Sequence, residues 1–200
     1  MNKEEIRSII LQKRLSLTPD EIKEKSQQIF DQLFHSPEYI KSSKIMFYVS
    51  TKSEVQTEEM IKTSIKEKKK VFVPIIYKDS VNLIPSQILN YDQELTRGSM
   101  GIWEPKRECL RLSPPEELEL IILPGIAFDM RGNRIGRGKG YYDNFLKKIN
   151  PSTYLIALSF EIQIVEHIPA LANDIPVHKI ITEKRIIDCL KKIDKLNKIC

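Results

Sequence analysis

The stretch LPGIAFDMRGNRIGRGKGYYDNFL, residues Leu123 to Leu146, carries the strongest structural signals in this chain. It begins at the end of an apolar run that is typical of a buried strand, and it ends in residues with helical spacing. The loop between them holds glycines at positions 132, 136, 138 and 140, with basic side chains at Arg131, Arg134, Arg137 and Lys139. Glycines permit positive φ angles, so successive N–H groups can point into one concavity that attracts anions. The combination predicts a polyphosphate-binding loop, whereas an isolated Gly-x-Gly would indicate a plain solvated turn equally well.

Two familiar phosphate-binding motifs do not match this loop. A P-loop requires Gly-Lys-Ser/Thr after a four-residue spacer, and a dinucleotide fingerprint requires Gly-x-Gly-x-x-Gly directly after a strand. Neither pattern occurs between residues 123 and 146. The residues alone therefore indicate a magnesium-dependent nucleotide or polyphosphate site, without specifying a reaction.

The run GNRIGRGKGYYD, from Gly132 to Asp143, resembles the signature of the 5-formyltetrahydrofolate cyclo-ligases, also called 5,10-methenyltetrahydrofolate synthetases. Other segments resemble the same family, namely Lys3-x-x-x-Arg7, Val49 to Thr57, the run GIWEP from Gly101, and Asn173-Asp174. The resemblance covers nearly all of the chain. It implies a three-layer α/β/α fold and an ATP- and Mg²⁺-dependent conversion of 5-formyltetrahydrofolate to 5,10-methenyltetrahydrofolate, with release of ADP and phosphate.

The resemblance also implies roles for individual residues. ATP would be bound by Lys3, Arg7, Arg134, Ile135, Gly136, Arg137, Gly138, Lys139, Gly140, Tyr141 and Tyr142. The folate would be bound by Val49, Glu54, Trp103, Arg137, Gly138, Lys139, Gly140 and Tyr141. Arg137 and Lys139 are the expected catalytic residues, because they would stabilise charge on the transferring phosphoryl group. Asp143 and Asp174 are the expected Mg²⁺ ligands.

The residues themselves leave several of these roles open. Lys3, Arg7 and Arg14 lie near one face of a helix predicted over residues 2–15, and such a pattern is also typical of a solvated charged face. Glu54 follows a predicted strand, where a carboxylate can accept hydrogen bonds from a heterocycle, but taken alone it reads as a surface acid.

Further candidates have equally plain alternatives. Trp103 either packs or offers a stacking face to a flat ring. Asp143 stands in the first turn of a predicted helix, where an acid also complements the helix dipole. Asp129 is a weaker candidate, expected behind the Mg²⁺ ligands rather than among them. His167 and His178 lack companions at metal-ligand spacing and read as structural or surface residues.

Composition limits the possible classes of protein. With 200 residues, 41% of them hydrophobic and 30% charged, the chain suits one globular domain over residues 1–200. It has no membrane-length apolar run and no apolar signal segment at its start, so we expect a cytoplasmic protein without a membrane partner. Its three cysteines are far apart and fit neither a disulfide framework nor a structural zinc site.

Charge is consistent with an anionic ligand. The formal net charge of +5 would suit ATP and a folate that carries a polyglutamate tail. The basic residues are spread along the chain and no aromatic-basic RNA motif occurs, so we expect no nucleic-acid partner. We expect a monomer, although the sequence contains no specific signal for the oligomeric state.

Hydrophobic periodicity predicts alternating helices and strands. Helices are expected at residues 2–15, 18–34, 57–68, 141–149 and 182–198, the second of them capped by Thr18. Strands are expected at residues 44–50, 71–76, 81–84, 119–124, 154–160 and 177–181, with Pro74 marking an end or a bulge in the second. The segment 86–118 lacks periodicity and is expected to cover the site. This order predicts an α/β sandwich with a largely parallel sheet.

Two other functional classes remain possible on sequence grounds. The first is a non-catalytic module that binds folate, nucleotide or RNA; it would tolerate loss of the magnesium ligands, and RNA binding would depend steeply on salt. The second is a sugar-phosphate isomerase, which would need a general base against a sugar carbon, and the sequence shows no specific signal for one.

Overall fold

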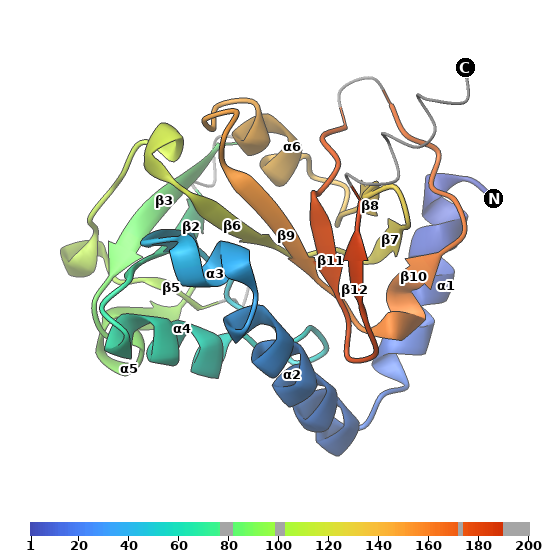
Figure 1. Ribbon diagram of the computed structural model, residues 1–200, viewed down its shortest axis with the longest axis horizontal. Coiled ribbons are helices and arrows are strands. Elements are labelled where there is room, and N and C mark those ends of the chain that lie inside the picture. Colours follow the sequence, from blue (N-terminus) through green and yellow to red (C-terminus); the bar gives the residue numbers. More distant parts are fainter. Residues whose placement is uncertain (77–81, 99–102, 172–173, 190–200) are drawn as a thin grey trace.

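A seven-stranded sheet runs through the centre of the computed structural model, which describes residues 1–76, 82–98, 103–171 and 174–189 (Figure 1). Over these ranges the strand order is β12-β11-β9-β6-β1-β2-β3. The strands are β1 (Lys44–Met46), β2 (Lys70–Ile76), β3 (Leu83–Ile88), β6 (Leu120–Leu123), β9 (Tyr154–Leu158), β11 (Lys179–Ile181) and β12 (Ile186–Asp188). Two smaller sheets pair β4 (Leu95–Arg97) with β5 (Trp103–Pro105), and β7 (Ala127–Asp129) with β8 (Arg134–Ile135) and β10 (Ile164–Val165). The helices are α1 (Lys3–Leu15), α2 (Pro19–Phe34), α3 (Pro37–Lys41), α4 (Glu58–Lys66), α5 (Tyr91–Glu94) and α6 (Tyr141–Leu146), with 3-10 turns at Arg107–Cys109, Pro115–Glu117 and Glu161–Gln163.

The central strands of the large sheet are parallel, as the sequence predicted. Strands β11, β9, β6, β1 and β2 run parallel to their neighbours, and the edge strands β12 and β3 are antiparallel. Parallel strands are buried on both faces, which explains why all four residues of β6 are apolar and buried. The predicted largely parallel α/β sheet is therefore confirmed.

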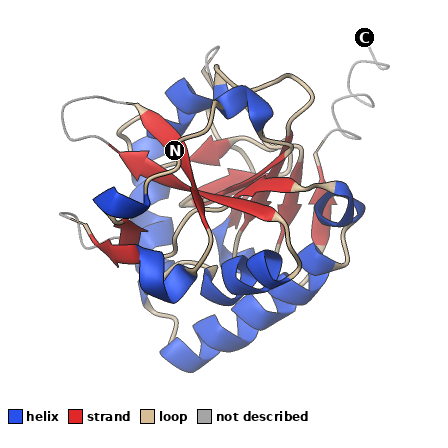
Figure 2. Ribbon diagram, turned by 90° about the vertical axis from the view of Figure 1, so that its left-hand side faces the viewer, coloured by secondary structure: helices blue, strands red, loops and turns tan. Residues whose placement is uncertain are grey.

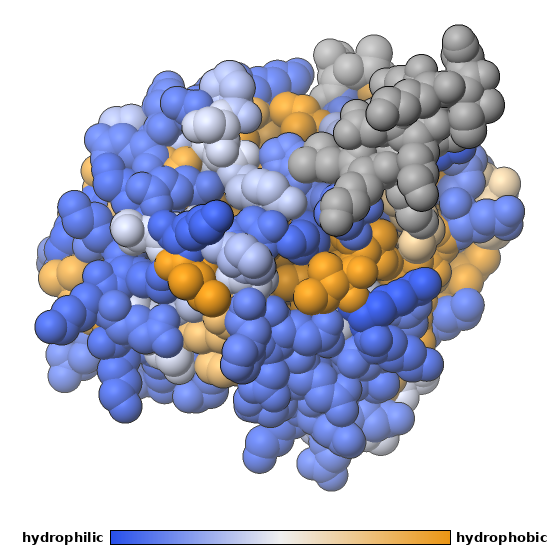
Figure 3. All heavy atoms as spheres, in the orientation of Figure 1, coloured by the Kyte–Doolittle hydropathy of each residue, from blue (hydrophilic) through white to orange (hydrophobic). Residues whose placement is uncertain are grey.

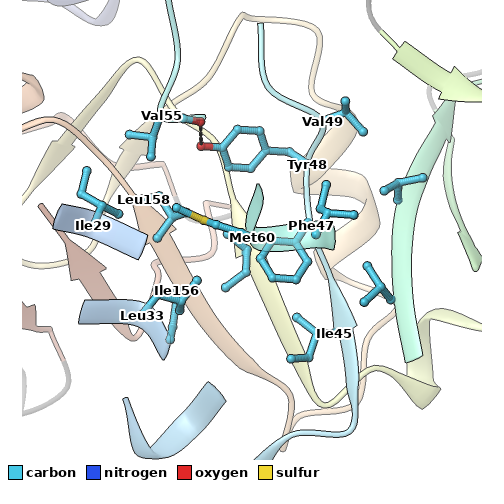
Figure 4. Packing of buried hydrophobic residues seen from close by; sticks show 14 of the residues in the cluster. Ile29, Leu33, Ile45, Phe47, Tyr48, Val49, Val55, Met60, Ile156 and Leu158 are labelled. Carbon is cyan, nitrogen blue, oxygen red and sulfur yellow. Dashed lines mark hydrogen bonds between the residues drawn. The ribbon is translucent and has the colours of Figure 1, made fainter. Parts of the chain in front are cut away.

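Helices cover both faces of this sheet (Figure 2). Side chains alternate along a strand, so Ile122 packs with α2 and α4 on one face while Ile121 packs with α6 on the other. Figure 4 shows the first of these layers, in which Ile29 and Leu33 of α2 approach Leu158 and Ile156 of β9. The two apolar layers, each closed by helices, give the expected three-layer arrangement.

The first helix packs away from these layers, against the small sheet. Ile6 and Ile10 of α1 are buried against Ile126, Ala127 and Ile135, in and beside β7 and β8. The predicted helical spacing of Ile6 and Ile10 is confirmed. This packing fixes α1 beside the glycine-rich loop that follows β8, and it therefore determines which basic residues of α1 reach that loop.

The predicted starts of α2 and α4 are both confirmed, although only the first is capped by its side chain. Thr18 caps α2 as expected, since its Oγ1 accepts from Glu21 N at 3.3 Å while Glu21 Oε2 accepts from Thr18 N at 2.8 Å. Thr57 precedes α4, but its hydroxyl donates to Tyr48 O at 2.8 Å instead of capping the helix. Helix α6 ends at Leu146, three residues before the predicted end.

The predicted helix from residue 182 is wrong over the described residues. Residues 186–188 form β12, which pairs antiparallel with β11, so β11 is not the last strand. Thr182 Oγ1 accepts from Lys184 N at 3.2 Å and from Arg185 N at 3.0 Å, and these bonds close a hairpin turn. The same pattern of bonds caps a helix, so Thr182 could not distinguish the two outcomes. Residues 190–198 of the predicted helix lie outside the described residues.

Pro74 neither ends β2 nor forms a bulge, contrary to the prediction. It pairs directly with Pro85 of β3, and the strand continues on both sides. Pro85 O accepts from Ser113 N at 3.0 Å, on the side away from β2. The two prolines thus face each other at a pair that exchanges no ladder hydrogen bonds, so neither missing N–H is needed.

The described parts of the segment 86–118, residues 86–98 and 103–118, lie partly along the β3 edge of the sheet, where Ser86 pairs with Leu112. Gln87 N donates to Arg111 O at 2.8 Å, and Lys106 N donates to Glu94 O at 2.8 Å, so the segment closes on itself and on β3. Arg111 also pairs with Glu94 at 2.8 Å. Its proposed role in covering the site remains a prediction.

The surface is mostly hydrophilic on the face shown in Figure 3, with apolar patches across its middle. Exposed apolar side chains include Ile40 of α3, at 62%, and Ile186 of β12, at 46%. Within the described ranges, every helix is too short or too polar to span a lipid bilayer.

His178 is expected to make stability depend on pH near neutrality. Its Nδ1 accepts from Leu155 N at 3.0 Å, and burial lowers the pKa of the ring. Such a histidine stabilises the fold above its unfolded pKa of about 6.5, and this contribution is lost as the pH falls. Urea titrations should therefore show the free energy of unfolding decreasing from about pH 7.5 to about pH 5.5, and decreasing less in His178→Asn. His35→Asn, which changes an exposed ring, serves as the control; equal slopes in all three proteins would contradict the prediction.

Candidate functional site

A tight turn between β7 and β8 begins the glycine-rich loop. The buried Asp129 carboxylate accepts from Arg131 N at 2.9 Å, from Asn133 N at 3.0 Å and from Asn133 Nδ2 at 2.9 Å. It also accepts from Ile168 N at 3.1 Å. These four bonds leave Asp129 a structural role in closing the turn, so the weaker suggestion that it supports a metal is not favoured.

Three of the four glycines adopt the backbone conformation that the sequence predicted. Gly132, Gly138 and Gly140 have φ angles of 86°, 89° and 69°. Gly136 does not have a positive φ, so this part of the prediction is wrong. A Cβ on Gly136 would lie 3.8 Å from Arg134 Nη1, and the backbone there instead accepts a hydrogen bond from α1.

Helix α1 brings its basic residues to this loop. Arg7 Nε donates to Gly136 O at 3.1 Å, and Arg7 Nη2 would lie 3.6 Å from a Cβ on Gly138. Lys3, one turn earlier, forms an ion pair with Asp174 at 2.6 Å. The structure therefore assembles residues from the start, middle and end of the chain that were predicted to share a site.

Asp143 and Asp174, the predicted Mg²⁺ ligands, each contact a cation. Arg134 Nη2 lies 2.6 Å from Asp143 Oδ1, and the Arg134 charge also acts on Asp174. Burial opposes ionisation of Asp174, but the hydrogen bond from Leu171 N and the Lys3 ion pair hold the pKa of this carboxyl below its usual value. Both acids are thus linked through Arg134 into one charged network.

The donor set of these two aspartates fits a magnesium ion shared with phosphates. Among the residues that the structure describes, no group of three or more acids, histidines or cysteines is placed to hold a metal by itself. Mg²⁺ prefers oxygen ligands and is usually held by one or two carboxylates together with substrate phosphates and water. Asp143 and Asp174 match that requirement in chemistry and in number.

Glu54 joins the loop after β1 to the glycine-rich loop. Its side chain is only 10% exposed, and Oε1 lies 2.8 Å from Arg137 Nη2. Its other oxygen accepts from Thr51 N at 2.8 Å, and Arg137 also donates to Thr51 Oγ1 at 3.3 Å. The predicted folate-binding acid and the predicted phosphate-binding cation are therefore in direct contact.

Other predicted residues lie around this centre in different ways. Val49 and Ile135 are buried, at 5% and 2% exposure, so their side chains belong to the apolar core. Tyr142 is partly buried and its ring lies 5.9 Å from the Arg134 guanidinium carbon. Burial and the Glu54 charge raise the pKa of Tyr142, which keeps its hydroxyl neutral.

The remaining predicted residues are more accessible. Arg137, Gly138 and Lys139 are exposed, while Gly140 and Tyr141 at the start of α6 are partly buried. Trp103 is 40% exposed beside Arg97, whose guanidinium carbon lies 5.6 Å from the indole ring. Trp103 is thus not a core residue, and stacking of its indole ring on a ligand remains a prediction. Gly101 and Asn173, which contributed to the resemblance, lie outside the described residues.

Two residues near Glu54 received no role from the sequence. Thr51 orients both Glu54 and Arg137, but a threonine in a polar loop carries no signal of its own. Arg14 is buried, and its charge interacts with Glu54 and Arg137. The sequence places Arg14 near the same side of the predicted helix as Lys3 and Arg7, but gives it no role there.

The charges of the site are arranged for a polyanionic ligand. Lys3, Arg134 and Arg137 each contact an acid of the site. Arg7, which lies 3.9 Å from the exposed Glu4, and Lys139 add further positive charge. A polyphosphate that entered would compete with the acids for these cations. The acids would then be available for a metal ion or for donor groups of a second ligand.

Comparison with known proteins identifies relatives of this chain. The sequence model of the 5-formyltetrahydrofolate cyclo-ligase family matches residues 1–183. A 5-formyltetrahydrofolate cyclo-ligase of Mus musculus is 32% identical over 189 residues, covering 89% of this chain and 92% of that protein. The 5-formyltetrahydrofolate cyclo-ligase of Escherichia coli (strain K12) is 29% identical over 182 residues, covering 89% and 98%.

Solved structures agree with the sequence comparison. The NMR structure of Aquifex aeolicus 5,10-methenyltetrahydrofolate synthetase has a TM-score of 0.82 and 31% identity, covering 94% of this chain and 93% of that one. A 5,10-methenyltetrahydrofolate synthetase from Mycoplasma pneumoniae has a TM-score of 0.74 at 22% identity, covering 92% and 99%, and supports the fold alone.

Proposed function

The chain belongs to the 5-formyltetrahydrofolate cyclo-ligase family, and we propose that it catalyses the ATP-dependent conversion of 5-formyltetrahydrofolate to 5,10-methenyltetrahydrofolate. The observation that carries this proposal is the contact between Glu54 and Arg137 at 2.8 Å. It joins an acid suited to the donor groups of a folate ring to a loop suited to phosphates. A reaction that transfers a phosphoryl group onto the folate needs both ligands at such a junction.

The reaction proceeds in two steps. The formyl oxygen of the substrate attacks the γ-phosphorus of ATP, the bond to the bridging oxygen breaks, and ADP leaves. The neighbouring folate amine then attacks the activated formyl carbon, the carbon–oxygen bond breaks, and phosphate leaves with that oxygen while the amine loses its proton. No side-chain nucleophile is needed, so the protein acts by positioning the reactants and stabilising charge.

The residues of the site divide these tasks. Arg137 and Lys139 stabilise charge on the transferring phosphoryl group, together with the N–H groups of the loop from Arg134 to Tyr142. Lys3 and Arg7 bind the phosphate chain of ATP. Glu54 accepts hydrogen bonds from the folate ring, and the indole of Trp103 stacks on the flat part of that substrate.

Magnesium would be held by Asp143 and Asp174, directly or through water. A bound Mg²⁺ supplies positive charge that neutralises the phosphates of ATP. Lys3 and Arg134, which contact these two acids at 2.6 Å, would turn to the phosphates instead. The acids of this network thus bind the metal, and its cations bind the phosphates, when ATP is bound.

The decisive test is near-ultraviolet absorbance, because the conjugated amidinium of the methenyl product absorbs where the formyl substrate does not. Purified protein with 5-formyltetrahydrofolate, ATP and Mg²⁺ should give rising absorbance. The rise should disappear when ATP is omitted or when a chelator removes Mg²⁺. A substrate sample shown to be competent with a known cyclo-ligase, but giving no rise with this folded protein, would favour the non-catalytic binding module.

Other properties follow from the same proposal. A single cyclo-ligase domain takes up the chain from residue 1 to 200, and it acts as a monomer on small-molecule substrates without a nucleic-acid partner. The positive net charge of +5 suits folates with polyglutamate tails. We expect a cytoplasmic location, although the related protein of Arabidopsis thaliana is named as mitochondrial.

A further inference from the structure

Glu54 depends on a partner that the proposed reaction takes away. Arg137 is the residue that forms an ion pair with Glu54, and the proposed function assigns the same side chain to the transferring phosphoryl group. Arg137 is 51% exposed while Glu54 is 10% exposed, so the arginine is the one that moves. Without Arg137, Glu54 would remain an almost buried anion whose carboxylate keeps, among the described residues, only the hydrogen bond from Thr51 N. A buried anion in that state is unfavourable unless a second cation lies close to it.

Arg14 is the second cation that lies close to Glu54. It is 3% exposed and forms no ion pair with any residue that the structure describes, and its Nε is buried without a hydrogen-bond partner. Burial lowers the pKa of Arg14, and the Glu54 charge acts in the opposite direction. Arg14 and Glu54 line the same narrow gap, together with Tyr48 and Gln163.

The surroundings of this gap leave Glu54 as the acid that faces Arg14. Tyr48 donates its hydroxyl to Val55 O at 2.9 Å, as Figure 4 shows, and burial raises the pKa of Tyr48 so that it stays neutral. Gln163 is uncharged and its Nε2 donates to Gly125 O at 3.0 Å. The charge of Arg14 is therefore balanced by Glu54 across the gap.

A purely structural role explains the burial of Arg14 poorly. Its hydrogen bond from Nη1 to Gly125 O is long, at 3.4 Å. Gly125 O already accepts the shorter bond from Gln163 Nε2. A buried charge with one weak and duplicated bond adds little to the fold, and such local violations are expected where a protein performs its function.

We propose that Arg14 is a positioning residue for this reaction: it is the permanent counter-ion of Glu54, which keeps that carboxylate in place when Arg137 turns to the phosphates. This proposal rests on the proposed function, because it requires that Glu54 binds the folate and that Arg137 binds ATP. It predicts that Arg14 acts through the charge of Glu54 and has little effect on the fold. Arg137 then pairs with Glu54 only before ATP binds, whereas Arg14 balances the same acid throughout.

The test is a double-mutant cycle of Arg14→Met and Glu54→Gln, read out as kcat/KM for 5-formyltetrahydrofolate at saturating ATP. Arg14→Met should lower this value at least about 10-fold in the native background and less than about 2-fold beside Glu54→Gln, because the acid it serves is then absent. The thermal midpoint of Arg14→Met should equal or exceed that of the native protein. Lys13→Met removes the same charge from the exposed neighbouring position of α1 and should stay within about 2-fold.

Each outcome of the cycle decides the question. Equal losses of activity in both backgrounds, or a large drop of the thermal midpoint, would overturn the proposal and leave Arg14 a structural anchor. Native activity in Arg14→Met would also overturn it. Arg14→Lys, which keeps the charge, should recover most of the lost activity, and failure to do so would count against a counter-ion role. Absence of product with the native protein would instead contradict the proposed function, so the two failures are distinguishable.

Discussion

Replacement of Lys139 by alanine should lower turnover by about 10²-fold or more while the protein stays folded, because one preorganised positive charge beside the transferring phosphoryl group is lost. Lys139 lies in the exposed part of the loop, between Gly138 and Gly140, where its side chain can reach a bound phosphate. The expected loss is mainly in kcat, since this charge stabilises the transition state more than it binds either substrate.

The experiment compares initial rates of methenyl product formation with thermal unfolding of the same samples. Lys147→Ala is the matched control, since it removes an exposed lysine just beyond the end of α6 and changes the net charge equally. The control should retain native turnover and both variants should unfold at about the native temperature. Full turnover in Lys139→Ala would remove this lysine from the mechanism and leave Arg137 as the main stabilising charge.

Replacement of Gly132 by alanine should cost the fold roughly 3 kcal/mol, the largest effect on stability that we expect in the loop. Gly132 has a φ of 86°, which strains a residue with a side chain, and its Cβ would lie 2.3 Å from Val177 O. The backbone has no room to yield, because Val177 N also donates to Gly132 O at 2.9 Å. The turn is therefore pressed against the segment that leads into β11.

Gly140→Ala is the control for the strain of a positive φ alone. Gly140 has a φ of 69°, but a Cβ there would meet nothing within 4 Å, so this change should cost only about 1 kcal/mol. Denaturant titrations of both variants measure the difference, and the Gly132→Ala protein should melt roughly 10 °C below the native one. Similar stabilities for the two variants would show that the contact with Val177 relaxes easily.

Much of the fold and part of the site could be predicted from local signals. The apolar run at residues 120–123, the capping residues before Pro19 and the spacing of Ile6 and Ile10 depend on neighbours along the chain, so these elements appear where expected. The glycine-rich loop could also be predicted, because its glycines and cations are close in sequence. The helix predicted from residue 182 failed over its described part because Thr182 forms the same hydrogen bonds in a hairpin turn as at a helix start.

Long-range pairing was decided only by the tertiary structure. The ion pair of Glu54 with Arg137 joins residues 83 positions apart, and that of Lys3 with Asp174 joins residues 171 positions apart. No periodicity records such partners, since they are set by which strand ends and helices meet at one edge of the sheet. Burial of Arg14 has the same origin, because α1 packs against β7 and β8 and carries this arginine into the gap beside Glu54. The sequence by itself determined which chemical groups are present and where the phosphate loop lies, whereas the packing of distant segments determined which acid each cation neutralises.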